Sequence, residues 1–414
     1  MTERPSGRIW RLDRNVFWAG VSSFFMDVSS EMVYSLVPVF LSSVLNVNKS
    51  LIGVIEGIAE TTASTLKMFS GWLSDKLDRR KPLMLFGYGV STLSRILLAL
   101  AGSWGAVLGA RFVDRFGKGV RTAPRDAIVA GSCEKKELGR SFGFHRAMDQ
   151  FGAVLGPGIA ALVLLWRPGG YRTVFWLALI PGALCVLVIA LFIRDKKRGE
   201  SKEDTECPAP DSTRPQTGAG RRAGRWRGPL LGYLLVTGVF ALGNSSDVFL
   251  ILRASDLKVA TALIPILYLV FNLIYASLSI PAGMLADRIG RRKLALLGFA
   301  VFAGAYAWMA VARSAAAAWG VFAVYGVYMG IADGNGRALL AEFSSEERHG
   351  TAFGAYHMVV GLGALPASVI AGLLYDHVSP AAPFWVGAGA AVLAGVMMVV
   401  LVPEPRRPDP PPET

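Results

Sequence analysis

The chain has 414 residues, of which 53% are hydrophobic and 18% are charged, and its mean hydropathy is +0.44. A water-soluble protein of this size would leave too much apolar surface exposed, so the composition excludes an ordinary soluble enzyme or binding protein. The net charge of +13 does not indicate nucleic-acid binding, because Lys and Arg lie in short loops between apolar runs.

Twelve apolar runs are long enough to cross a bilayer core, which takes about 20 residues of helix. The runs are 16–44, 51–73, 82–101, 104–130, 142–166, 173–193, 229–252, 260–286, 294–313, 316–341, 351–375 and 383–402. They predict an all-α membrane protein with two six-helix bundles, residues 1–193 and 229–402. The first run has no small-residue cleavage site, so we expect it to be retained as a span.

The polar stretches between and after these runs predict the topology. Residues 194–228 are rich in charged residues, Pro, Gly and Ser, which indicates a flexible linker, and the Pro-rich 403–414 indicates a disordered tail. Most of the 43 Lys and Arg fall in the linker and in the loops on the same side as the chain ends, so we expect both termini in the cytoplasm. The three Cys and four His form no metal-binding pattern, and we expect neither a metal nor a cofactor.

A loop recurs once in each half. Gly71–Lys81 and Gly283–Lys293 lie 212 residues apart, and each follows one apolar run and precedes another, as in a two-fold repeated transporter. The segments resemble the G-x-x-x-D-x-x-G-R-R-K loop of the major facilitator superfamily. The second copy matches at every fixed position, whereas the first has Asp78 in place of Gly. The resemblance covers nearly the whole chain and implies two halves that rock about a central cavity.

The same resemblance implies a conformational latch at the cytoplasmic face. Asp75 and Asp287 should end their spans there, where a carboxylate can pair with Arg or cap a helix N-terminus. In the family this contact holds the outward-open state; the alternative is that these charges only set topology. Arg337 follows Arg125 by 212 residues, so we expect the two to be symmetry mates. The residues assigned to the latch are Gly71, Asp75, Arg79, Arg80, Arg125, Gly283, Asp287, Arg291, Arg292 and Arg337.

The fifth run resembles the G-x-x-x-G-P element of drug/proton antiporters through Gly152, Gly156 and Pro157. The later Gly pair of that element is replaced by Ala160 and Ala161. Small residues four apart let helices approach closely, and Pro weakens the local hydrogen-bond ladder. The resemblance implies export by exchange for protons; the alternative is ordinary packing of small residues.

Four carboxylates lie within the first two runs, at spacings of four residues. They are Asp27, Glu31, Glu56 and Glu60. A charge at bilayer depth costs at least ~2.5–3.5 kcal/mol, so such residues are functional candidates. Burial near a second carboxylate raises proton affinity, and such a group can carry a proton when access alternates. Asp27 is the preferred carrier, followed by Glu31 and then Glu60; the alternative is permanent ion pairing.

The fourth run carries a basic face made by Arg111, Arg115, Lys118 and Arg125. Arg111 resembles the Arg of the family's R-x-x-Q-G element, from which Asp114 and Arg115 depart. Asp114 can pair with Arg111 or Lys118, and Arg95 adds a charge in the third run. Two hypotheses stay open: a salt-bridge network that rearranges between states, and a site for a carboxylate or phosphate of the cargo.

The second half is poorer in charge. It offers Asn244, Asp247, Asn272 and Tyr275 as a cargo wall, with Phe271 and Tyr325 as further linings. This asymmetry suggests that the first half handles the coupling ion.

These features predict a monomeric, multi-pass secondary transporter of the inner membrane. We expect it to expel a small organic compound, with organic anions among the candidates, against inward proton flow. No nucleophile–base or phosphate-loop pattern indicates an enzyme. One alternative is a transporter of a metal ion or a metal chelate such as a siderophore complex, because Gly117–Asp126 resembles a segment of bacterial permeases. Another is a membrane sensor that does not transport.

Overall fold

The computed structural model describes residues 8–9, 12–76, 80–130, 132, 138–194, 228–343 and 349–403. The predicted linker and C-terminal tail lie almost entirely outside the described residues. A short antiparallel hairpin, β1 (Arg8–Ile9) and β2 (Leu12–Asp13), precedes the helices. Nearly all of the remaining described chain is helical.

Each predicted apolar run corresponds to one helix or to a broken pair of helices. The first bundle contains α1 (Arg14–Tyr34), α2 (Val37–Ser43), α3 (Lys49–Lys76), α4 (Lys81–Leu100), α5 (Trp104–Ala130), α6 (Leu138–Trp166) and α7 (Tyr171–Phe192). The second contains α8 (Gly228–Gly243), α9 (Val248–Asp256), the 3-10 turn η2 (Thr261–Leu263), α10 (Ile264–Ile289), α11 (Arg291–Val311), α12 (Ala315–Phe343), α13 (His349–His377) and α14 (Ala382–Leu401).

Two breaks divide runs that the hydropathy pattern predicts as continuous. The first run divides between α1 and α2, where Pro38 occupies the first turn of α2 because it lacks an N–H to donate. The seventh run divides between α8 and α9 at the polar residues 244–247. Ten described segments are long and apolar enough to cross a membrane; α3 and α5, which carry several buried charges, are not among them. The count of twelve spans therefore stays a prediction.

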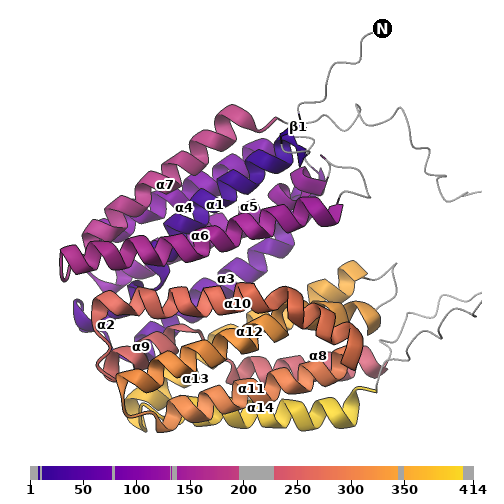
Figure 1. The fold of residues 1–414 in the computed structure, drawn as a ribbon. Coiled ribbons are helices and arrows are strands. Elements are labelled where there is room, and N and C mark those ends of the chain that lie inside the picture. The colour runs from indigo at the N-terminus through magenta and orange to yellow at the C-terminus, as the bar shows by residue number, and fades with distance from the viewer. Residues whose placement is uncertain are drawn as a thin grey trace, which may run out of the picture.

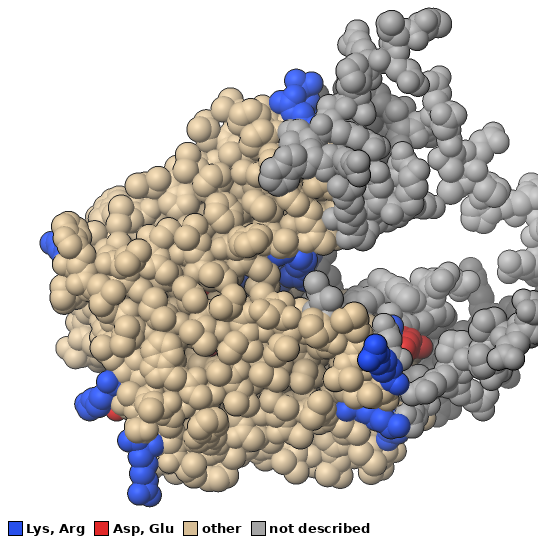
Figure 2. Space-filling view, viewed as in Figure 1, with Lys and Arg blue, Asp and Glu red and all other residues tan. Residues whose placement is uncertain are grey.

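The two bundles lie side by side and diverge at one end (Figure 1). They meet along two helix pairs, α3 with α13 and α6 with α10. We call the end where α7 finishes and α8 begins the open face, and the opposite end the closed face. A large apolar core joins both bundles toward the closed face and includes Leu36, Phe40, Phe249 and Tyr375. The flanks of both bundles are almost free of charged residues in Figure 2, as contact with lipid requires.

The two bundles repeat the same packing at a sequence offset that changes by one residue between helices. Gly119 of α5 packs against Leu66 of α3, and Gly330 of α12 packs against Leu278 of α10 in the same way. The offset is thus 212 residues for α3 and α10 but 211 for α5 and α12. The loop copies Gly71–Lys81 and Gly283–Lys293 are equally long, so the change of offset is seen in the helix contacts and not in the length of the motif.

Hydrogen bonds made by the loop arginines agree with this offset. The Arg80 Nη1 donates to the carbonyl of Ala127 at 3.0 Å, and the Arg291 Nη1 donates to that of Ala338 at 3.0 Å. The expected equivalence of Arg125 and Arg337 is therefore corrected, because an offset of 211 places Gly336 opposite Arg125.

The α3–α13 contact is much tighter than the α6–α10 contact. A Cβ on Gly53 would overlap the carbonyl oxygen of Ser368, and one on Gly57 would lie 2.9 Å from the Cα of Leu365. A Cβ on Gly158 of α6, by contrast, would meet only the Leu269 Cδ1, at an ordinary 3.5 Å. The bundles are therefore held together mainly along α3 and α13, and they leave space beside α6 and α10.

Candidate functional site: the central cavity

A polar cavity of about 730 Å³ lies between the bundles. Its lining residues are Asp27, Glu31, Lys67, Lys118, Arg121, Thr122, Arg125, Asp126, Phe142, His145, Arg146, Asp149, Gln150, Ala153, Asn272, Tyr275 and His357. Most come from α1, α5 and α6 of the first bundle. Figure 2 shows the cleft between the bundles with basic side chains at its mouth. The cavity is therefore reached from the open face.

The deepest part of the α5 basic face is neutralised by α3. Arg111 grips Glu56 with two parallel bonds, Nε to Oε1 at 3.0 Å and Nη2 to Oε2 at 2.5 Å. Both side chains are at least 96% buried. A planar guanidinium matches a carboxylate in this forked geometry. Because both groups are shielded from water, removing one partner would strongly destabilise the fold. Glu56 and Arg111 therefore form a fixed structural pair in this state.

Two further ion pairs extend this network. Arg115 Nη2 lies 2.8 Å from Glu60 Oε1, one helical turn from the first pair. Arg95 of α4 lies 3.1 Å from Asp114, and its remaining donors reach the hydroxyls of Ser29 and Ser30 at 3.2 and 3.0 Å. Asp114 thus pairs with Arg95, rather than with Arg111 or Lys118 as expected. The three ion pairs form a buried network to which Glu60 belongs. Its rearrangement between states stays a prediction.

Asp27 and Glu31 differ from these acids. Neither makes an ion pair or hydrogen bond with another described residue, and both line the cavity. The Glu31 Oε2 is buried and has no hydrogen-bond partner in the described part of the chain. Of the four predicted carboxylates, these two are available to bind a proton or a cargo group.

The predicted small-residue motif of α6 holds these two acids in place. A Cβ on Gly152 would lie 2.9 Å from the Asp27 Cβ, and one on Gly156 would lie 3.1 Å from the Glu31 Cβ. The four-residue spacing of the glycines matches that of the acids, so each acid packs against α6 at a glycine, where no side chain projects. Pro157 lies inside α6 one residue further on. The motif therefore lets α1 approach α6 at the coupling candidates.

Four basic residues besides Arg125 line the cavity wall, namely Lys67, Lys118, Arg121 and Arg146. Lys118 makes no ion pair with a described residue, and neither does Lys67. Arg121, which the sequence pattern did not single out, places its guanidinium 4.5 Å from the ring centroid of Tyr88, and its Nη1 is buried without a partner. Its position three residues after Lys118 could have indicated it. Arg125 is neutralised by Asp126 at 2.9 Å.

A His–Asp pair in α6 was likewise not expected from the sequence. His145 Nδ1 lies 3.4 Å from Asp149 Oδ2, and the His145 Nε2 is buried without a partner. The spacing of four residues on the cavity side of α6 was the only available signal, and Gly152 follows Asp149 by three residues.

The second bundle supplies less of the cavity than expected. Asn272 and Tyr275 line it, and the Asn272 Nδ2 donates to the carbonyl of Ala153 across the α6–α10 contact at 3.3 Å. Asp247 does not line it; its Oδ1 accepts a 2.6 Å hydrogen bond from the Tyr325 hydroxyl. Asn244 lies at the break between α8 and α9. Phe271 and Tyr325 stack on each other in the buried core, so they are not cavity linings in this state.

Only part of the predicted latch can be placed. Gly71 and Asp75 fall in the last turns of α3, where the structure describes only the backbone, and Arg79 lies outside the described residues. The side chains of Asp287 and Arg337 are likewise not described.

The described latch residues tie the loops to neighbouring helices. Beyond the Arg80 bond, Arg291 also pairs with Glu342 at 3.1 Å, and the Arg292 Nη2 donates to the carbonyl of Val399 at 2.7 Å. Gly283 is exposed, and a Cβ there would meet no atom within 4 Å. The latching role stays a prediction.

Known proteins resemble the chain over almost its full length. The family model described as Major Facilitator Superfamily matches residues 19–253 and 234–414. An MFS-type transporter of Methanocaldococcus jannaschii is 34% identical over 397 residues, covering 94% of this chain and 95% of the relative. The quinolone resistance protein NorA of Staphylococcus aureus is 21% identical over 45% of the chain and 47% of its own length.

Solved structures support the same fold. The nucleoside transporter NupG covers 94% of this chain and 99% of its own at a TM-score of 0.75 and 11% identity. A POT family transporter bound to 5-aminolevulinic acid covers 96% and 97%, at a TM-score of 0.77 and 10% identity. Two repeated bundles about a charged cavity, together with these full-length matches, show that the chain belongs to the Major Facilitator Superfamily and is a multi-pass membrane transporter.

Proposed function

We propose that this protein is a monomeric inner-membrane exchanger that expels a small organic compound in return for protons. The observation that carries the proposal is the division of the buried acids. Glu56, Glu60 and Asp114 are held in ion pairs, whereas Asp27 and Glu31 face the cavity with no ion-pair or hydrogen-bond partner among the described residues. The likeness of the α6 glycine motif to drug/proton antiporters, and the similarity to a quinolone resistance protein, favour the export direction.

The structure represents one of the two states that such an exchanger needs. With the termini in the cytoplasm, as the sequence predicts, the cavity faces inward and the opposite side is closed. On the closed side, the Asp376 carboxylate of α13 accepts bonds from Ser50 N at 2.6 Å, Ser50 Oγ at 2.7 Å and Lys49 N at 3.2 Å. Because these bonds cap the start of α3 from the other bundle, they must break before the outside can open.

Exchange imposes a condition on the cargo. An exchanger returns a proton in place of cargo, so the two must compete for the same carrier. At Asp27 and Glu31 this competition arises when the cargo presents a cationic or hydrogen-bond-donating group to the carboxylates. Deprotonation then strengthens cargo binding, so the affinity should rise with pH.

A second candidate function rests on Lys118 and Arg121. These cations have no ion-pair partner among the described residues, and they share the cavity with Asp27 and Glu31. If they hold an anionic group of the cargo, protonation of the two acids removes competing negative charge and strengthens binding. Anion and proton would then move together, and the affinity should fall as pH rises.

A metal cargo and a sensor role gain less support. Among the described residues no three His, Cys, Asp or Glu side chains are grouped to hold a metal ion, so the structure offers nothing in favour of a metal cargo. The full-length matches to MFS transporters favour transport over a sensor role, and a flux measurement tests it.

The deciding experiment is transport by purified protein in sealed proteoliposomes with an imposed pH gradient. A fluorescent quinolone serves as the cationic-group probe and 4-methylmuconolactone as the second probe, because a probable transporter of that compound from Cupriavidus pinatubonensis is 27% identical over 197 residues. Gradient-driven accumulation of either probe supports proton coupling. Exchange predicts probe movement opposite to the protons; movement in the same direction establishes the second candidate. Equal flux with and without the gradient would refute both.

A further inference from the structure

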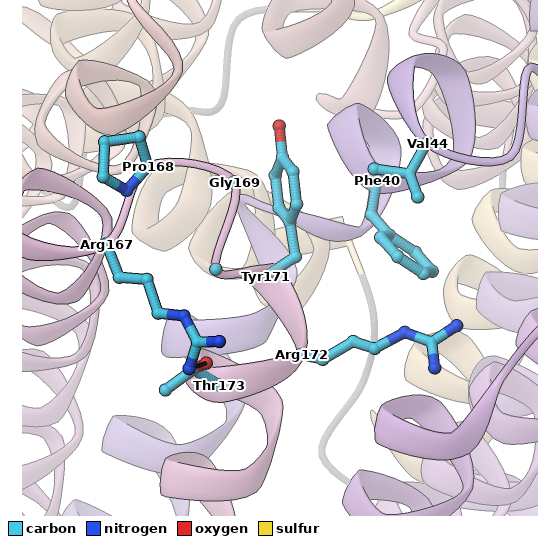
Figure 3. A pocket seen from close by; sticks show the side chains of 9 residues that line it. Phe40, Val44, Arg167, Pro168, Gly169, Tyr171, Arg172 and Thr173 are labelled. Carbon is cyan, nitrogen blue, oxygen red and sulfur yellow. Dashed lines mark hydrogen bonds between the residues drawn. The ribbon is translucent and has the colours of Figure 1, made fainter.

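A second pocket lies on the closed face, away from the cavity and its coupling acids. It has a volume of about 360 Å³ and is lined by the end of α2, the α6–α7 loop and the first turn of α7. Two of its lining residues are Arg167 and Arg172, and none of the described residues that line it is acidic. Figure 3 shows their side chains extending on either side of the start of α7. The pocket is therefore a concentrated positive site.

The local sequence fixes the geometry of this loop. Pro168 and Gly169 occupy the central positions of a tight turn closed by a 2.9 Å bond from the Gly170 N–H to the Arg167 carbonyl. Gly169 has φ of +76°, which glycine adopts without strain, and Pro presets the preceding position. Arg167 therefore leaves the end of α6 in a defined direction.

Both arginines are held in place without being neutralised. The Arg172 Nη2 donates to the carbonyl of Ala101 at 2.8 Å, and the Arg167 Nη1 contacts the Thr173 hydroxyl at 3.4 Å. Neither makes an ion pair with a described residue, so most of their donors face the pocket or solvent. Lys and Arg are normally enriched on the cytoplasmic side of a membrane protein. With both termini in the cytoplasm, the closed face is the opposite side, so two arginines there depart from that rule and suggest a function.

The surroundings place the pocket at the level of lipid headgroups. The α6 helix ends at Trp166, whose side chain is 83% exposed, after Leu162 and Leu165, which are also exposed. Trp176 of α7 is exposed on the neighbouring helix. Exposed tryptophans beside apolar helix surface are typical of a membrane interface, where acyl chains meet phosphates.

We infer that this pocket binds the phosphate of an anionic phospholipid from the leaflet at the closed face. Because the two side chains extend on either side of the start of α7 (Figure 3), one guanidinium gives paired donors to the phosphate and the other adds positive charge to the headgroup region. The exposed Val44, just after α2, contacts the adjoining glycerol and acyl region. A bound lipid would join α2 to the α6–α7 loop, and so would stabilise the closed face.

The test uses the full-length protein in nanodiscs of phosphatidylcholine with or without phosphatidylglycerol. We expect phosphatidylglycerol to raise the melting temperature of the wild type. The double variant Arg167→Gln/Arg172→Gln should lose this increase while melting normally in phosphatidylcholine. Native mass spectrometry should show retained phosphatidylglycerol reduced by about tenfold, because each arginine near a lipid headgroup contributes to binding. Arg313→Gln, an exposed arginine on the same face, is the matched control.

Three results would overturn the inference. The double variant could melt lower by the same amount in both lipids, which would assign the arginines a purely structural role. The control could lose the lipid effect equally, which would indicate diffuse attraction. Inorganic phosphate added to phosphatidylcholine nanodiscs could reproduce the increase, which would indicate a soluble anion rather than a lipid.

Discussion

The two bundles place chemically different groups at equivalent positions of one packing scheme. In the first bundle Arg95 and Asp114 form a buried ion pair at 3.1 Å. At the offset of 211 residues, the corresponding residues are Tyr306 and Tyr325, whose ring centroids lie 6.1 Å apart. The repeat preserves the helix contact but not the chemistry. One bundle thus carries a buried ion pair at this helix contact, whereas the other carries aromatic rings.

The largest expected effect comes from removing one partner of the Arg95–Asp114 ion pair. Asp114→Ala should destabilise the protein by about 3 kcal/mol, because Arg95 stays buried with only hydroxyl partners. The measurement is thermal or denaturant unfolding in detergent. Arg95→Leu/Asp114→Ala, which removes both charges, should recover part of the loss. A single variant as stable as the wild type would contradict a fixed pair.

The second prediction compares the α3–α13 contact with the α6–α10 contact. Gly53→Ala should disfavour the present state by about 1–3 kcal/mol, because the added methyl overlaps the Ser368 carbonyl across the α3–α13 contact. Spin-label distances across the closed face should then show a larger fraction opened there. Gly158→Ala, at the looser α6–α10 contact, is the control and should leave the distribution unchanged. Equal responses would remove the distinction between the contacts.

Asp376→Ala tests the polar part of the closed face. It removes the acceptors for three donors of the first turn of α3, which we expect to cost about 1 kcal/mol and to raise the opened fraction several-fold. Ser50→Ala removes only the hydroxyl bond and should have a smaller effect in the same spin-label measurement. If Ser50→Ala had the larger effect, the capping role of Asp376 would be wrong.

The smallest effect is expected in the aromatic bundle. Tyr306→Phe should cost about 0.5–1.5 kcal/mol, because the ring contacts with Phe302 and Tyr325 remain and only a hydroxyl is lost. Unfolding under the same conditions as Asp114→Ala gives the comparison. A loss as large as that of Asp114→Ala would mean that the aromatic bundle depends equally on polar contacts.

Hydropathy predicted where most of the helices lie and their order, but not the breaks between α1 and α2 and between α8 and α9. The partners of the charges were not predictable, because pairing depends on how α3, α4 and α5 rotate against one another. The spacing on α5 suggested Arg111 or Lys118 as the ion-pair partner of Asp114. The packing of α4 against α5 instead places Arg95 beside it. The change of offset from 212 to 211 was likewise not evident from the two loop motifs, which are equally long; the contacts of Gly119 and Gly330 show it.

The central claim is that Asp27 and Glu31 exchange protons while the paired acids do not. Infrared difference spectroscopy of the purified protein during a pH titration tests this without knowledge of the cargo. The account predicts a carboxylic-acid carbonyl band that titrates in the wild type, persists in Glu60→Gln, and disappears in Asp27→Asn/Glu31→Gln. A titrating band that survives in the double variant, or that disappears in Glu60→Gln, would contradict it.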